Sequence, residues 1–283
     1  MKKFTLLFLV IFLSGCSLNK VIVRSATGFM EDGISVLYRE DDLGIAEHYL
    51  ANNLKMIEIL LVKDPNNTRL NIIASQGFGA YAMSFVEDTD PNRASKLYLR
   101  GVKYGLKALP KKKKFSINTP PKELENILKK YNTDDIAALF WTGYNWGLYI
   151  MQNLDQTANL VNLAKTEMIM KRCLELGQSY YYYSVDLFFG AYYAGRPKIL
   201  GGNPEKGKGF FLHNIEQNKD KIILGKLFYA RYYAIQTFNE ELFDNLIEEI
   251  LTFDIEKNPD YKLLNAVCQK KAKLLKQNKN TYF

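Results

Sequence analysis

The sequence predicts an all-α fold, because three kinds of observation all favour helices. Apolar residues recur at three- and four-residue spacing, for example at Leu50, Leu54 and Ile57, which places them on one helical face. No stretch alternates apolar and polar residues as a half-buried strand does, and no Asn-Gly hairpin signal occurs. Half of the eight prolines follow Asp or Asn, a pair that is typical of helix starts.

These Asx-Pro pairs divide the chain into helical segments. An Asp or Asn side chain can accept hydrogen bonds from the exposed N–H groups of a first helical turn, where proline also fits because it has no N–H. The pairs are Asp64-Pro65, Asp90-Pro91, Asn203-Pro204 and Asn258-Pro259. The segments between them are expected to end near Lys63, Leu109, Leu176, Asn218 and Asp254.

The last three predicted helix ends are about 40 residues apart, a spacing typical of stacked helix-turn-helix units. Residues 174–180 (LELGQSY) also resemble the junction between two tetratricopeptide units. We therefore expect an array of helical hairpins that forms a divergent tetratricopeptide-like superhelix. An irregular helical bundle without a true repeat is the alternative.

The N-terminus has the pattern of a bacterial lipoprotein precursor. Lys2 and Lys3 precede an apolar stretch over residues 4–13, which is shorter than the about 20 residues that span a bilayer but suits a signal peptide. The stretch ends in Leu13-Ser14-Gly15-Cys16, where the small residues admit a peptidase and the Cys16 thiol is the acylation site. An ordinary cleaved signal followed by a chance cysteine is the alternative.

These features predict the domain organisation and the location of the protein. Residues 1–15 are expected to be the signal peptide, residues 16–30 a lipidated tether, and residues 31–283 a single helical tetratricopeptide-like domain. Ser17 rather than Asp follows Cys16, so no obvious signal retains the protein in the inner membrane. In a cell with two membranes we therefore expect an anchor in the outer membrane, with the body facing the periplasm.

The composition of the chain argues against a nucleic-acid partner. The formal charge of +8 is modest for a chain of 283 residues, and no basic module with interleaved aromatic residues indicates nucleic-acid binding. Besides Cys16, the cysteines are Cys173 and Cys268. Both lie in apolar helical patterns, which favours free thiols, with a disulfide as the alternative.

Two stretches interrupt the helical pattern. Residues 110–121 contain four consecutive lysines and a closing proline, and are expected to form a surface loop, with docking to anionic headgroups or an acidic partner as the alternative. Residues 195–204 contain Arg196-Pro197 and Gly201-Gly202, and are expected to form an ordered turn between two helices. Residues 202–208 (GNPEKGK) match the first seven positions of a phosphate-loop pattern. Gly209 stands where that pattern needs Ser or Thr, and Pro204 removes an N–H, so a capped helix start explains these residues better.

No catalytic constellation is visible. His48 and His213 are the only histidines, and neither has the spacing of a metal ligand. No nucleophile elbow occurs, and no cysteine has a plausible histidine partner. The sequence therefore predicts a protein that is not an enzyme and that needs no cofactor or metal.

Aromatic residues are unusually abundant, with 19 Tyr and 17 Phe. They gather in residues 78–85, 141–149, 180–193 and 228–233. Most are expected to fill the space between helices. An array with Tyr and Trp on its inner surface is also able to form an apolar groove with polar tips.

Several short blocks occur in order along the chain. They are Ser75-Gln76-Gly77-Phe78, Tyr81-Ala82, Phe85-Val86-Glu87, Arg93-Ala94, Leu97-Tyr98, Arg100-Gly101, Leu139-Phe140-Trp141-Thr142-Gly143, Trp146-Gly147, Arg196-Pro197, Gly201-Gly202 and Glu205-Lys206. In this order they resemble the TatT family, the T component of tripartite ATP-independent periplasmic (TRAP) transporters. The resemblance covers about residues 30–275. Asn203 departs from it, because an acidic residue is expected after the glycine pair.

The resemblance implies a lipid-anchored periplasmic protein of tetratricopeptide-like hairpins that forms a homo-oligomer such as a trimer. It also implies partnership with the transporter's substrate-binding protein and a hydrophobic cleft or pore open to a ligand. It brings no catalytic residue. The blocks coincide with the aromatic clusters, and they make the following residues candidates for lining the cleft: Tyr81, Trp141, Tyr144, Trp146, Phe188, Tyr192, Arg196, Gly201 and Gly202.

The leading hypothesis is thus a non-enzymatic accessory lipoprotein for TRAP-type uptake, which binds the substrate-binding protein and a small hydrophobic or organic-acid ligand. The alternative is an envelope scaffold that docks membrane-assembly proteins and carries no ligand. A third hypothesis makes the protein itself a carrier of hydrophobic molecules.

Overall fold

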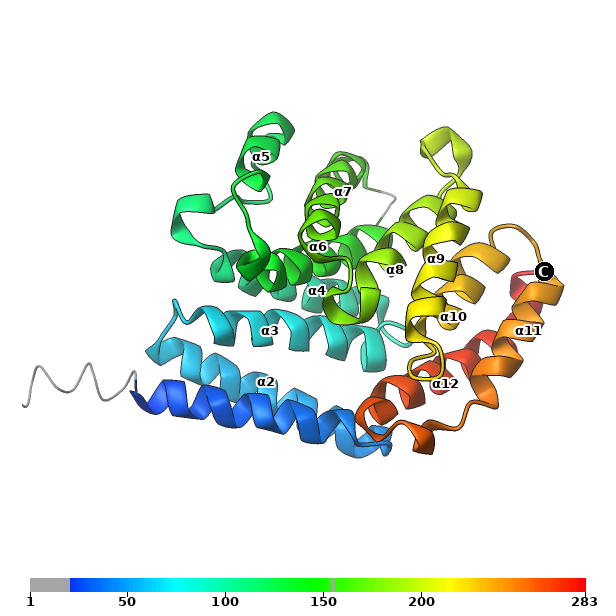
Figure 1. Ribbon diagram of the computed structural model, residues 1–283, viewed down its shortest axis with the longest axis horizontal. Coiled ribbons are helices and arrows are strands. Elements are labelled where there is room, and N and C mark those ends of the chain that lie inside the picture. Colours follow the sequence, from blue (N-terminus) through cyan, green and yellow to red (C-terminus); the bar gives the residue numbers. More distant parts are fainter. Residues whose placement is uncertain (1–20, 154–155) are drawn as a thin grey trace, which may run out of the picture.

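The computed structural model describes residues 21–153 and 156–283, and this part of the chain contains helices but no β-strand (Figure 1). The prediction of an all-α fold is confirmed. An N-terminal helix covers residues 21–38. The α-helices that follow are α2 (Leu43–Lys63), α3 (Thr68–Tyr81), α4 (Pro91–Ala108), α5 (Pro121–Leu128), α6 (Ile136–Met151), α7 (Thr157–Gly177), α8 (Tyr180–Ala194), α9 (Pro204–Asn218), α10 (Leu224–Tyr229), α11 (Glu240–Leu251) and α12 (Lys262–Gln277).

Helices that are close in sequence also pack together in space. The most extensive contacts join α3 to α4, α4 to α6, α6 to α7, and α8 to α9. Figure 1 shows the resulting curved array, in which α12 returns to the N-terminal helices. There Leu37 and Ala46 share a buried cluster with Leu263 and Val267 of α12. The tetratricopeptide-like superhelix stays a prediction.

The Asx-Pro pairs lie at helix starts or in the turns before them, as predicted. The side chains of Asp90 and Asn203 cap α4 and α9, each with proline in the first turn. Asp64 ends α2, and Asn67 then caps α3. Asn258 precedes a short 3₁₀ helix that leads into α12. The predicted helix ends agree with those of α2, α4, α7 and α9 within one residue, and with that of α11 within three.

The segment expected to be a tether differs from the prediction. From residue 21 onward it is helical, and Val23 is only 3% exposed because it packs with Ile57 and Leu61 of α2. The apolar residues of this segment recur at helical spacing, and the segment therefore belongs to the folded body. The predicted signal peptide and Cys16 lie outside the described residues.

Helices α3, α4 and α6 approach one another closely around Asn145. A Cβ added at Gly79 of α3 or at Gly101 of α4 would lie within 2.6 Å of the Asn145 side chain. The Asn145 amide donates to the carbonyl oxygens of Ser75 (3.0 Å) and Trp141 (2.8 Å). These blocks of the family resemblance therefore include residues that hold three helices together.

Both interruptions of the helical pattern are ordered. Lys113 of the lysine run forms an ion pair with Asp135 at 2.7 Å, and Phe115 is buried, while Lys111, Lys112 and Lys114 are not. The lysine run is thus part of a surface loop, which the Lys113–Asp135 ion pair and the buried Phe115 fix to the rest of the protein. Residues 195–204 form a turn in which Gly201 is left-handed at φ 81°. Cys173 and Cys268 are free, buried thiols and form no disulfide.

Candidate functional site

Two adjoining apolar pockets lie where the N-terminal helix, α2, α3, α8 and α12 meet. Each holds about 70 Å³. The N-terminal pocket is lined by Met30, Ile34, Leu37, Tyr38, Tyr49, Leu50, Asn53, Leu54, Ile57, Ile73, Gln76, Gly77, Ala80, Ser84, Phe85, Tyr181 and Leu263. The central pocket is lined by Tyr38, Ala80, Met83, Ser84, Trp141, Tyr144, Tyr181, Tyr182, Ser184, Leu224, Asp260, Tyr261, Leu263, Leu264 and Val267.

Tyr38 and Tyr181 belong to the shared wall of these two pockets. Their hydroxyl oxygens are 3.2 Å apart, and the Gln76 amide donates to the Tyr38 hydroxyl at 2.8 Å. Burial, followed by the proximity of Tyr181, raises the pKa of Tyr38 well above its ordinary value. Burial raises the pKa of Tyr181 as well. Both phenols therefore stay neutral. The part of the shared wall that they form is an uncharged pair of hydrogen-bonded side chains.

Tyr181 begins a left-handed turn inside α8. Tyr181, Tyr182 and Tyr183 have φ angles of 44°, 60° and 59°. In this conformation the Cβ atom of an L-residue crowds its own carbonyl oxygen, at a cost of roughly 1–2 kcal/mol per residue. Residues held in this way gather at functional sites. The turn directs two tyrosines into the pockets instead of continuing the helix.

Two asparagines of α9 hold the turn in place. The Asn214 amide donates to the carbonyl oxygens of Tyr182 (3.1 Å) and Tyr183 (3.0 Å). The Asn218 amide donates to the carbonyl oxygen of Tyr182 at 2.8 Å. Both asparagines are buried, and these bonds satisfy carbonyl groups that the broken helix leaves open. The conformation is therefore imposed by α9, more than thirty residues away in sequence.

Several predicted cleft residues line pockets. Trp141 and Tyr144 line the central pocket. Tyr144 also lines a smaller side pocket of about 30 Å³ between α6, α8 and α10, together with Phe188 and Tyr192. Phe188 stacks on Tyr192 with their ring centroids 5.7 Å apart. The structure thus brings four of the candidates to two neighbouring pockets that share Tyr144.

The remaining candidates do not line these pockets. Tyr81 and Trp146 are buried in the packing between helices. The guanidinium carbon of Arg196 lies 3.6 Å from the centroid of the Tyr192 ring, and the Arg196 Nε donates to the Tyr192 carbonyl oxygen. Gly201 and Gly202 shape the turn that follows, where a Cβ on Gly202 would collide with the Arg196 carbonyl oxygen. Arg196, Gly201 and Gly202 thus shape the turn after α8.

A fourth and larger cavity holds about 620 Å³ and has four charged side chains in its lining, so we call it the polar cavity. It adjoins the side pocket through Met151 and Tyr232. Its lining residues are Glu87, Asp88, Met151, Gly195, Leu227, Arg231, Tyr232, Ile235, Gln236, Lys271, Leu274, Leu275, Asn278 and Tyr282.

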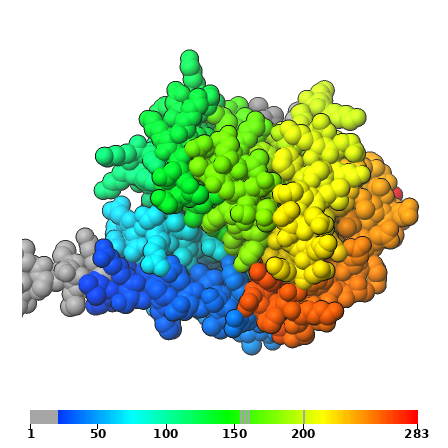
Figure 2. All heavy atoms as spheres, in the orientation of Figure 1, coloured from blue at the N-terminus to red at the C-terminus, as the bar shows by residue number. Residues whose placement is uncertain are grey.

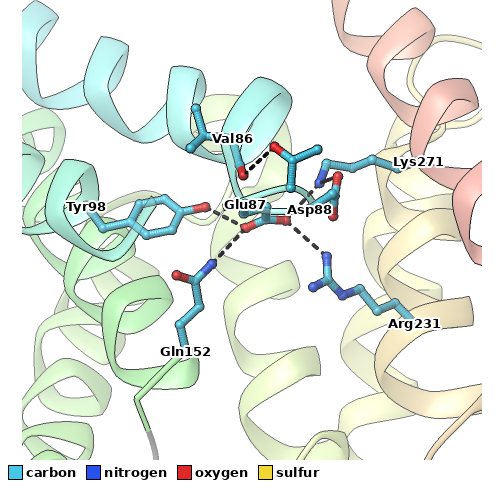
Figure 3. A network of polar contacts seen from close by, with 8 residues as sticks. Val86, Glu87, Asp88, Tyr98, Gln152, Arg231 and Lys271 are labelled. Atoms are coloured by element: carbon cyan, nitrogen blue, oxygen red, sulfur yellow. Dashed lines mark hydrogen bonds and ion pairs between the residues drawn. The ribbon is translucent and has the colours of Figure 1, made fainter. Parts of the chain in front are cut away.

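Glu87 is the centre of an ion network beside this cavity (Figure 3). Its carboxylate accepts from Lys271 Nζ at 2.8 Å and from an Arg231 guanidinium nitrogen at 3.0 Å. The Tyr98 hydroxyl donates to its other oxygen at 2.6 Å. Lys271 also contacts Asp88 at 2.6 Å. The network joins Glu87 and Asp88, which come shortly after α3, to Arg231 and Lys271 in the C-terminal part of the chain.

The two charges at the centre of this network are almost fully buried, whereas the side chains of Asp88 and Arg231 are 22% and 37% exposed. The side chains of Glu87 and Lys271 are 6% and 4% exposed. Burial by itself raises the pKa of Glu87, but the charges of Lys271 and Arg231 outweigh burial and lower it. Glu87 is therefore ionised at neutral pH, and each of its oxygens has a partner. This is the arrangement that a buried ion pair needs in order to be tolerated.

His213 also has an acidic partner, and this pair has a structural role. Its Nδ1 lies 2.6 Å from an oxygen of the buried Asp186, whose second oxygen accepts from Gln178 at 3.1 Å. Within residues 21–153 and 156–283, no group of three or more His, Cys, Asp or Glu is placed to hold a metal ion.

Tyr38, Tyr181 and Glu87 are site residues that were not predicted from the sequence. Tyr181 lies in a run of four tyrosines, but nothing in that run indicates a left-handed turn. Glu87 lies in one of the family blocks, so its position there was the available signal. Tyr38 had no signal, because it lies at the end of a helix that packs onto the site only in the folded chain.

The fold and the pockets define a class of helical protein whose interior offers small apolar and polar cavities. Across its described residues, no helix carries an apolar run long enough to cross a bilayer.

Comparison with known proteins then identifies the family. The chain belongs to the TRAP transporter T-component family (TAtT), whose sequence model matches residues 39–283. This family consists of accessory components of TRAP transporters and is not an enzyme family. An uncharacterized protein of Treponema pallidum (strain Nichols) is 26% identical over 304 residues, which cover 95% of this chain and 94% of that protein.

Proposed function

We propose that this protein is a lipid-anchored periplasmic accessory protein of a TRAP-type transporter. It binds the transporter's substrate-binding protein and takes a small hydrophobic or organic-acid ligand into the joined N-terminal and central pockets. Acylation of Cys16 anchors it to an envelope membrane, and the outer membrane is favoured. Its family membership supports the link to the transporter. The joined pockets are the observation that supports ligand binding.

The strained turn supports a role for Tyr181 in ligand entry. Each pocket alone, at about 70 Å³, is well below the roughly 300–1,000 Å³ of an ordinary ligand site. The pockets share Tyr38 and Tyr181, so parting these two side chains makes one longer cavity. Opening breaks one hydroxyl contact and gives the turn an opportunity to relax. The free-energy cost of opening is therefore small, and a ligand that binds only the open form needs to offset only that small cost.

The protein partner fits a tethered mode of action. Two proteins confined to one thin compartment meet at a high effective concentration, so that a weak contact is sufficient. Self-association into a homo-oligomer further multiplies such contacts. The lipid anchor thereby holds the substrate-binding protein near the membrane.

Ligand binding is tested with two substitutions that fill different pockets. Ala80 lines both joined pockets and Ala191 lines only the side pocket. The probe is the fluorescent dye 8-anilinonaphthalene-1-sulfonate, and native mass spectrometry of the purified protein checks for a co-purified ligand. We expect Ala80→Phe to abolish dye binding and Ala191→Phe to retain it. Equal dye binding by both variants and the parent would contradict the assignment to the joined pockets.

The protein partner is tested separately, by co-purification with a substrate-binding protein encoded beside this gene. Retention of that protein by Ala80→Phe would show that partner and ligand sites are distinct. Binding of envelope-assembly proteins, with neither dye nor substrate-binding protein bound, would instead establish the scaffold hypothesis.

A further inference from the structure

Large exposed apolar side chains concentrate on the first two described helices. On the N-terminal helix they are Val21, Ile22, Phe29 and Val36; on α2 they are Ile45, Met56, Ile59 and Val62. Elsewhere in the described residues such side chains are scattered singly, which is ordinary for a protein surface. A concentration of this kind marks an interaction surface.

The side chains on the N-terminal helix form a stripe. Ile22, Phe29 and Val36 are seven residues apart, and at 3.6 residues per turn this spacing keeps them on nearly the same side of the helix. At a rise of 1.5 Å per residue the stripe is about 21 Å long. The side of the helix that packs inward, through Val23 and Leu37, is turned by about 100° from this stripe, because each of these residues comes one position after a stripe residue. The helix therefore has two apolar faces, and only one of them is covered.

The exposed apolar residues of α2 lie on the helix that packs next to this one. Val23 packs with Ile57 and Leu61, and Leu37 packs with Ala46, so the two helices run in opposite directions. This register places Ile22 level with Ile59 and Val36 level with Ile45. Figure 1 shows the two helices side by side, and Figure 2 shows their blue atoms at the edge of the molecule. We call the two stripes together the N-terminal apolar face.

We propose that the N-terminal apolar face lies against the membrane that carries the lipid anchor. This inference rests on acylation of Cys16, as in the proposed function. Residue 21 is five positions from Cys16, a distance of at most about 17 Å even for an extended chain. The start of the stripe is therefore held close to the bilayer surface, where an apolar helical face inserts to a depth of about 5–10 Å.

Charge contributes little to this docking. Near the stripes, Arg24, Lys55 and Lys63 are balanced by acidic residues such as Asp32 and Glu47. Attraction to anionic lipid headgroups is therefore small, and the apolar side chains supply the affinity. Docking should then occur on uncharged phosphatidylcholine, and it should persist in about 1 M salt, where the Debye length is only about 3 Å.

The test uses full-length, lipid-anchored protein with a polarity-sensitive dye on a new cysteine. Phe29 and Phe238 are matched sites, because each is 77% exposed and they lie at opposite ends of the chain. Cys173 and Cys268 are buried, so Phe29→Cys and Phe238→Cys are labelled selectively. Each protein is reconstituted in phosphatidylcholine vesicles, with and without lipid that carries a spin label near the headgroup.

We expect the dye at position 29 to lose roughly half its emission to spin-labelled lipid, because an inserted face brings it among the labelled lipid segments. The dye at position 238 should keep its emission. Adding Ile22→Glu and Val36→Glu to Phe29→Cys should remove most of the quenching.

Three other results would overturn the proposal, and each identifies a different cause. A dye at position 29 that only aqueous iodide quenches shows a face open to water. A dye that neither quencher reaches shows a face covered by protein, such as a second copy of the chain. Protein that fails to float with the vesicles refutes the lipid anchor as well as the docking.

Discussion

Replacing Tyr183 by alanine and, in a second variant, by glycine tests the left-handed turn at the start of α8. Both variants lose the tyrosine ring, including its contact with His213 at 5.6 Å between centroids. They differ only in the Cβ atom. Since Tyr183 has φ 59° and ψ 29°, alanine keeps the strain of this conformation and glycine removes it.

The expected difference follows from two opposing contributions. Removing the Cβ from a left-handed residue stabilises the fold by roughly 1–2 kcal/mol. Glycine also loses more backbone entropy on folding than alanine, which costs roughly 0.5–1 kcal/mol. The glycine variant should therefore be the more stable by about 0.5–1 kcal/mol. At a right-handed helical position the order is reversed, and glycine is less stable by about 1 kcal/mol.

Urea unfolding followed by circular dichroism measures this difference through the transition midpoint. With m values of a few kcal/mol per molar, the glycine variant should unfold at a midpoint higher by roughly 0.2 M. Leu212, an exposed residue of α9, provides the control pair, in which Leu212→Gly should be less stable than Leu212→Ala. A glycine variant of Tyr183 less stable than its alanine counterpart would refute the left-handed turn.

Three further predictions concern buried ionisable groups. Glu87→Gln leaves the buried Lys271 and the partly exposed Arg231 short of their counter-charge and should cost about 3 kcal/mol of unfolding free energy, measured with urea. Because the pKa of Glu87 is lowered on folding, its stabilisation is present above the unfolded value of about 4.3 and is lost as the pH falls through the folded value. Thermal melts should therefore show a steeper acid loss for the parent than for Glu87→Gln, and parallel curves would contradict this. Burial raises the pKa of Cys268 to about 12 and raises that of Cys173 too, so maleimide should modify both only after unfolding, as read by mass spectrometry.

The parts of the fold that follow from local chemistry were predictable from the sequence. Asp90 and Asn203 cap the helices that begin at the next residue, because capping depends on a side chain and the N–H groups of the adjoining turn. The helical segments followed from apolar periodicity. The N-terminal helix shows the limit, because the lipoprotein pattern predicted a tether over residues 16–30, whereas residues 21–38 are helical.

The candidate site was predictable only in part, for a physical reason. Trp141 and Tyr144 lie on a regular helix and line the central pocket, so a local aromatic cluster was enough to make them candidates. Their role in binding a ligand stays a prediction. Tyr181 reaches the pockets only because its turn is left-handed. That conformation is held by Asn214 and Asn218, and no local preference of tyrosine indicates it.

The link between Glu87 and Arg231 in the ion network escaped prediction because both residues lie at π-helical turns. Residues Ala82–Val86 and Ala230–Ala234 each form one, with backbone bonds from Glu87 to Ala82 (2.9 Å) and from Ile235 to Ala230 (3.3 Å). Such a turn holds one extra residue, which rotates everything after it away from the face that a 3.6-residue period assigns.

The two π-helical turns also reveal a repeat. Each follows the same pattern, a glycine, three variable residues, then Tyr-Ala, at residues 77–82 and 225–230. Glu87 directly follows the first turn, and Arg231 lies inside the second. The link between the two halves of the chain therefore joins two copies of one local structure. Because π-helical turns are frequent at functional sites, the shared position of both copies beside the polar cavity favours a common role for them.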